Sequence, residues 1–222
     1  MSKADKFARA IRDALGPWAE QHGFTSASRA GDLPCFRRVP ALLVREAVPG
    51  FVEQIHFTAR RASRVNPTNT HEIAPTVAVR VQAVEDPLDA YFSSIDPHYL
   101  EGNGRVHPLE MTVAATMGEL LPHSRVRRIA DLQTAGDLGG RIQRELDEAG
   151  LPWLESHRAL APVLSTLQAM RVPSINALHR RLVLAQQLGN LEDERLEVRI
   201  AADRMGPLAD SLEGLVDHLR QG

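Results

Sequence analysis

Polar side chains on two predicted neighbouring strands have the types and spacing best suited to chemistry. The four are Gln54, His56, Arg80 and Gln82. They alternate with apolar residues in the runs 51–60 and 75–83, and a period of two places alternate side chains on one face of a strand. If the runs pair, the four would lie side by side. Because arginine suits planar acceptors, this face could line a groove for a carboxylate-bearing ligand or a peptide.

A third predicted strand, over residues 34–39, could extend this polar face. It carries Arg37 and Arg38, and we add Arg38 to the candidate ligand-binding residues. The alternative is a solvated outer sheet face, which antiparallel sheets commonly have.

The motifs that usually mark catalytic or metal sites are missing from the sequence. None of the nine histidines has a second histidine three to five residues away, the spacing that zinc sites often use. The chain contains neither a Gly-x-Ser-x-Gly elbow nor a phosphate-binding loop with its lysine. We therefore predict no catalytic residue, no metal and no cofactor, and we leave enzymatic activity open while favouring its absence.

Two local clusters admit a functional and a structural interpretation. The carboxylates of Glu85, Asp86, Asp89 and Asp96 could serve a hard cation or acid–base chemistry. The Asp-Pro steps among them instead favour turns, so we expect an irregular stretch over 84–108 with at most one short helix around 87–92. Gly136 and the pair Gly139-Gly140 could hold an anion at a helix start, but we favour close packing.

The first part of the chain predicts a helix followed by strands. An apolar stripe over residues 3–22 indicates an amphipathic helix that is interrupted at Gly16-Pro17 and capped by Gly23. Strands are expected at 34–39, 41–44, 51–60, 75–83, 109–117 and 125–132.

From residue 134 the apolar spacing becomes helical. Helices are expected over 137–149 (stopped by Gly150), 159–170, 174–188 (capped by Ser174 and stopped at Gly189-Asn190), 191–205 and 207–219. Short connections are typical of antiparallel helix packing. We predict an α+β fold: a mainly antiparallel sheet of four to five strands under the N-terminal helix, in a domain 1–132, followed by a helical region 133–222.

Composition excludes several classes of protein. The net charge is −2 over 222 residues, and residues 1–121 and 122–222 each carry 13 basic and 14 acidic side chains. No basic stripe with interleaved aromatics is present, so we expect no nucleic-acid partner. No apolar run reaches the roughly 18 residues of a membrane span, which favours a cytoplasmic protein. The single cysteine, Cys35, excludes an intrachain disulfide.

Several segments together resemble the bacterial domain-of-unknown-function family 4304. They are the helix end 15–24 (Leu-Gly-Pro-Trp-Ala-Glu-Gln-His-Gly-Phe), the Phe-Arg-Arg strand at 36–38, the strand with Gln54 and Ile55, the alternating valine strand and the turn 150–154 (Gly-Leu-Pro-Trp-Leu). The resemblance covers roughly residues 4–170. It implies no established activity, and it implies a role beside secreted toxins only because similar small α+β domains occur among immunity proteins.

Two functions follow as hypotheses. The first is a non-catalytic bacterial protein, an immunity or accessory factor that binds another protein through an exposed apolar or acidic patch. The alternative is a small-molecule-binding domain or hydrolase that uses the polar sheet face. A third hypothesis is a helical scaffold in which residues 171–222 alone retain the partner. The oligomeric state is left open.

Overall fold

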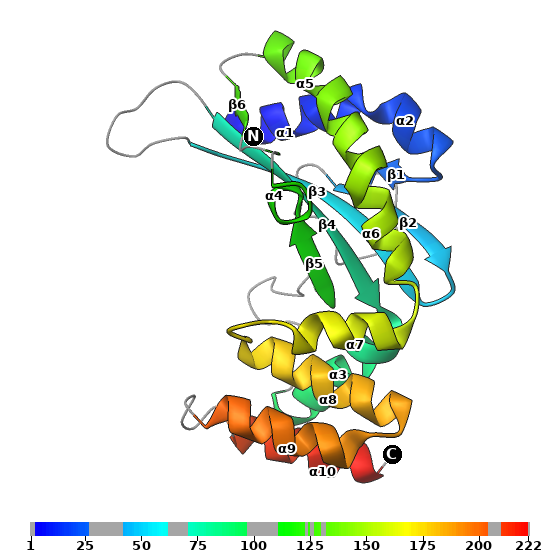
Figure 1. Ribbon diagram of the computed structural model, residues 1–222, viewed down its shortest axis with the longest axis vertical. Coiled ribbons are helices and arrows are strands. Elements are labelled where there is room, and N and C mark those ends of the chain that lie inside the picture. Colours follow the sequence, from blue (N-terminus) through cyan, green and yellow to red (C-terminus); the bar gives the residue numbers. More distant parts are fainter. Residues whose placement is uncertain are drawn as a thin grey trace. The chain divides into compact units, whose positions relative to one another are not determined.

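The computed structural model describes residues 3–26, 42–61, 71–96, 111–122, 124, 127–129, 132–203 and 210–221 (Figure 1). The chain forms two compact units, each built from two segments. The first unit is Met1–Val79 with Ala114–Glu155, and the second is Arg80–Val113 with Ser156–Gly222. The predicted division of the chain at residue 132 stays a prediction.

The sheet contains the central strand pair that the sequence predicts. Its strands are β1 (Thr25–Ser26), β2 (Leu42–Val48), β3 (Phe51–Arg61), β4 (His71–Val81), β5 (Val113–Thr116) and β6 (Arg127–Ile129). The order is β1-β2-β3-β4-β5, with β6 also paired to β4. The turn between β2 and β3 is closed by Gly50, which has φ 79° and donates its N–H to Glu46 at 2.8 Å. The predicted α+β class with an antiparallel sheet is confirmed.

The N-terminal helix packs on this sheet as expected. Helix α1 (Lys3–Ala14) contacts β3 and buries Phe7 and Ile11. Helix α2 (Gly16–Gln21) restarts with its proline in the first turn, where a missing N–H costs least. Gly23 ends it with φ 74°, and Phe24 then stacks on Trp18 with ring centroids 5.9 Å apart.

The helices that follow β5 and β6 correct one prediction. A capped turn, α4 (Met117–Leu120), precedes α5 (Leu132–Glu145), the π-helical turn η3 (Leu146–Gly150) and α6 (Leu151–Ser156). We predicted that Gly150 ends a helix, and this is wrong, because the chain continues from η3 into α6. A Cβ on Gly150 would lie 2.9 Å from the Leu146 side chain and 3.4 Å from Val77 of β4, so the glycine leaves the room that the Leu146 side chain occupies.

The second unit is helical and centres on one helix. It contains α3 (Gln82–Ile95), α7 (Leu160–Gln168), α8 (Ile175–Leu188), α9 (Leu191–Ala202) and α10 (Asp210–Gln221). Helix α8 contacts each of the other four, and Figure 1 shows it between α7 and α9. The predicted ends of α8 are confirmed: the Ser174 hydroxyl accepts from the Ala177 N–H at 3.2 Å, and Gly189 closes the helix with φ 77°.

Helix α3 overturns two expectations about the chain after β4. The strand ends at Val81, so Gln82 and Ala83 belong to a helix, and residues 84–95 are not an irregular stretch. The buried residues of α3 include Val84, Leu88 and Tyr91, a helical spacing. Pro87 removes only one backbone donor near the start of the helix, and burial of this apolar face outweighs that loss.

Within the described part of the chain, the helices are too short or too polar to span a lipid bilayer.

Candidate functional site

Gln54 and His56 meet on β3, as the strand pattern predicts, but they lie in the interior. Their side chains are 0% and 5% exposed, and His56 Nε2 lies 2.8 Å from Gln54 Oε1. On β2 they oppose Val44 and Leu42. Burial lowers the pKa of His56 to about 4, so the imidazole is neutral at pH 7. This part of the sheet face is therefore not a solvated surface.

The opposite face of β3 holds a buried ion pair that the sequence analysis missed. The fully buried Glu53 carboxylate accepts from Arg45 Nε at 2.5 Å. A second Arg45 nitrogen donates to the His22 carbonyl at 2.6 Å, and the guanidinium lies 4.3 Å from the centroid of Phe24. Pairing across an antiparallel register at Arg45 and Glu53 is the signal that could have located it. The contact joins β2 and β3 to the end of α2.

The other predicted ligand-binding residues do not join the Gln54–His56 pair as one observed cluster. Arg80 belongs to the second unit, where its guanidinium lies 3.6 Å from Asp86 and 3.8 Å from Asp89. Gln82 is exposed at the start of α3, and Arg38 lies outside the described residues. The role of these five residues in ligand binding stays a prediction.

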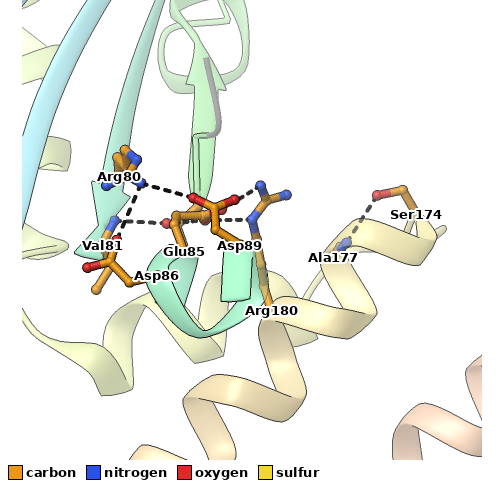
Figure 2. A network of polar contacts seen from close by, with 9 residues as sticks. Arg80, Val81, Glu85, Asp86, Asp89, Ser174, Ala177 and Arg180 are labelled. Atoms are coloured by element: carbon orange, nitrogen blue, oxygen red, sulfur yellow. Dashed lines mark hydrogen bonds and ion pairs between the residues drawn. The ribbon is translucent and has the colours of Figure 1, made fainter. Parts of the chain in front are cut away.

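The carboxylates that we expected in turns lie on α3, and one of them organises the second unit. Glu85 is fully buried and accepts hydrogen bonds from Arg180 Nε at 2.7 Å, from Arg180 Nη2 at 3.0 Å and from the Thr112 hydroxyl at 2.7 Å (Figure 2). The Thr112 oxygen in turn accepts from the Val81 N–H at 2.8 Å. The network holds α3, α8 and the residue before β5 together, so its role is structural. The turn prediction for Glu85, Asp86 and Asp89 was wrong.

Burial also acts on a second carboxylate of α3. It raises the pKa of Asp89, against the opposing charge of Arg80.

A serine–histidine pair in the second unit has hydrogen-bonding geometry, but no third group orients the histidine among the described residues. His179 Nε2 on α8 lies 3.0 Å from Ser211 Oγ on α10, and burial lowers the pKa of His179 to about 4. The other ring nitrogen of His179 is buried without a partner in the described structure. Since catalytic triads orient that nitrogen with a carboxylate, the pair fits helix packing better than nucleophilic catalysis.

Helix α9 presents apolar side chains on two opposite faces. Its buried residues are Leu191, Glu194, Val198 and Ala202. Leu196 and Ile200 each lie two positions from buried residues, about 200° around a helix, and their exposed fractions are 63% and 67%. An apolar face normally packs against another element. The outward pair therefore marks α9 as a candidate interaction surface.

Charged residues surround this pair. Asp193 and Glu197, one turn apart, are exposed on one side, and Arg199 is exposed on the other. Glu192 is already paired with Arg220 at 2.5 Å. We use the name α9 surface for Asp193, Leu196, Glu197 and Ile200.

A hollow of about 210 Å³ lies between α9 and α10. Val198 and Leu212 contribute apolar walls, and Arg195, Arg199 and Glu213 contribute polar lining. Arg195 is held there by Glu213 at 2.7 Å. The hollow borders the Arg199 side of α9 and could accept a side chain of a molecule bound to the helix.

Across the described residues, no three His, Cys, Asp or Glu side chains are grouped so that they could hold a metal ion. No match to the chain is found among protein-family models, curated proteins or solved structures. The resemblance to the domain-of-unknown-function family 4304 therefore stays a prediction.

Proposed function

We propose that this chain is a non-catalytic protein-binding factor, an immunity or accessory protein of a bacterium. The observation that carries the proposal is the second, outward apolar face of α9. The large hydrophobic residues exposed in the described structure are Ile95, Met170, Val172, Leu188, Leu196 and Ile200, and all six belong to the second unit. Of these, Leu196 and Ile200 lie one turn apart on the same face of α9, and an exposed apolar face of this kind favours contact with another protein.

The form of the second unit modifies the scaffold hypothesis. Residues 171–222 contain α8, α9 and α10, but Arg180 of α8 needs Glu85 of α3 as its partner. A fragment of residues 171–222 lacks α3, so Arg180 would lose its hydrogen bonds to Glu85. The binding function is therefore proposed for the whole chain.

A pull-down tests this function. The tagged full chain is incubated with lysate of the host organism, and retained proteins are identified by mass spectrometry against an unrelated bait. We expect one specific partner in near-equal amount, and a partner with toxin-like features would make the chain an immunity factor. Failure to retain any specific partner from lysates of several growth conditions contradicts the proposal.

One observation favours the alternative of a small-molecule-binding domain. The Gln54 side chain is fully buried, and its amide nitrogen has no hydrogen-bond partner in the described structure. Buried amide groups are normally satisfied, so a small ligand that accepts from Gln54 would complete the pair with His56. A thermal-shift screen of metabolites tests this, because a true ligand raises Tm for the wild type and not for Gln54→Leu.

A further inference from the structure

We propose that the α9 surface binds a basic amphipathic helix, with apolar side chains over Leu196 and Ile200 and lysine or arginine beside Asp193 and Glu197. This inference rests on the proposed function and names the chemical class of its partner. Leu196 and Ile200 are spaced by one helical turn, so they match the i, i+3, i+4 spacing of apolar residues on a facing helix. Such a helix would cover the part of α9 that the chain leaves exposed.

The carboxylates of the α9 surface favour a positively charged partner. The Asp193 and Glu197 carboxylates are exposed, and neither has an ion-pair partner in the part of the chain that the structure describes. Glu192 and Arg220 neutralise one another, and Arg199 is a single base on the other side of the helix. An apolar strip bordered by unpaired carboxylates is complementary to an apolar strip bordered by cations.

The same charges disfavour a second copy of this chain. Among the described charged residues of α9 and its C-terminal end, Glu192, Glu194 and Arg195 have ion-pair partners, and the remaining Asp193, Glu197 and Asp203 outnumber Arg199. A symmetric dimer through α9 would therefore bring two faces of the same sign together. Like charges at a contact reduce affinity and slow association. A partner of opposite sign has no such cost.

Fluorescence anisotropy with defined peptides tests the inference directly. The probe is a labelled Leu/Lys peptide of about 18 residues, long enough for a stable bound helix, with leucine at positions i, i+3, i+4 and i+7. Two control peptides are a scramble of the same composition and a Leu/Glu peptide with the same leucine spacing. We expect the full chain to bind the Leu/Lys helix and to prefer it to both controls by about tenfold or more.

Matched variants of the full chain locate the contact. Leu196→Ser with Ile200→Ser should weaken binding about tenfold or more, because both anchors are lost. Asp193→Asn with Glu197→Gln should weaken binding about three- to tenfold at low salt and remove most of its salt dependence. Met170→Ser with Val172→Ser changes two other exposed apolar side chains of the same unit and should leave binding unchanged. All substituted residues are exposed, and thermal melts confirm that each variant folds.

Three results would overturn the inference. The first is equal binding of the Leu/Glu and Leu/Lys peptides, and the second is wild-type affinity in the Leu196→Ser, Ile200→Ser variant. The third is a dimer in sedimentation velocity that this variant abolishes, which would make a second copy the occupant. These results can be told apart from a failure of the proposed function, in which the pull-down from host lysate retains no specific partner. A lysate partner that the variant still retains would uphold the function and reject this surface.

Discussion

Arg180 of α8 donates two hydrogen bonds, of 2.7 and 3.0 Å, to the fully buried carboxylate of Glu85 on α3. The two residues are 95 positions apart, so the contact joins the two chain segments that make up the second unit. A buried pair adds little net stability compared with apolar packing, but removal of one partner leaves the other charge buried and uncompensated.

Replacement of Arg180 by methionine should therefore lower the free energy of unfolding by about 3–5 kcal/mol. Urea titration followed by far-UV circular dichroism measures the loss. The control is Arg220→Met, which removes an exposed partner of Glu192 and should produce no resolvable change. Equal effects of the two substitutions would show that Glu85 does not depend on Arg180.

Two adjacent glycines of α5 offer a sharper comparison. A Cβ on Gly139 would lie 2.9 Å from the Cβ of Ala14, whereas a Cβ on Gly140 would meet nothing within 4 Å. Gly139→Ala should force α1 and α5 apart and destabilise the first unit by about 1–3 kcal/mol. Gly140→Ala should stabilise it by up to about 1 kcal/mol, because alanine is the better helix former. Thermal melts of both variants measure the difference, and the same sign for both would contradict the close approach at Gly139.

Close packing at these two glycines was only partly predictable from the sequence. We predicted close packing at the Gly139-Gly140 pair, and the contact with Ala14 confirms it for Gly139 alone. The choice between neighbouring glycines depends on which side of α5 faces α1, and no local pattern contains that information. The Ser174 cap and the Gly189 end of α8 were predictable, because each depends on the chemistry of its own residue and the adjacent backbone.

The errors have a common physical origin. The Asp86-Pro87 step suggested a turn, although Val84, Leu88 and Tyr91 already had the apolar spacing of a helix. Burial of these three side chains in the folded protein favours the helix over the turn. The polar face of β3 was expected in solvent or in a groove because Gln54 and His56 are polar. Only the packing around them determines that both are buried. The α9 surface could not be predicted either. The sequence shows that α9 has apolar residues on several sides, but only the structure shows which of those sides is buried and which is exposed.

Acid should destabilise the chain through two buried histidines. Burial lowers the pKa of His56 to about 4, and burial followed by the charge of Arg180 does the same for His179. The unfolded state binds protons near the ordinary pKa of 6.5 and the folded state only near 4, so stability is fully present above pH 6.5 and is lost as the pH falls toward 4.

Between pH 7 and pH 5 each histidine should account for roughly 2 kcal/mol of lost stability. Urea titrations at both pH values should show a smaller loss for His179→Asn than for the wild type, even though the variant starts from lower stability. His218→Asn, which replaces an exposed histidine, is the control substitution. An unchanged pH dependence in His179→Asn would show that His179 is not the group that titrates.

The Gln54–His56 pair yields a prediction that separates a structural role from a ligand site. The Gln54 amide nitrogen is buried and has no hydrogen-bond partner among the residues that the structure describes, which costs free energy in the unliganded chain. Replacement of both residues by apolar ones, Gln54→Met with His56→Leu, removes this cost together with the bond between them, so the double variant should be at least as stable as the wild type at pH 7. His56→Leu alone should be less stable, because it leaves the Gln54 oxygen buried without its donor. Urea titration of the three proteins measures both differences. A double variant that is markedly less stable than both the wild type and His56→Leu would mean that the pair makes a further contact. That result would direct the search for a ligand to this face of β3.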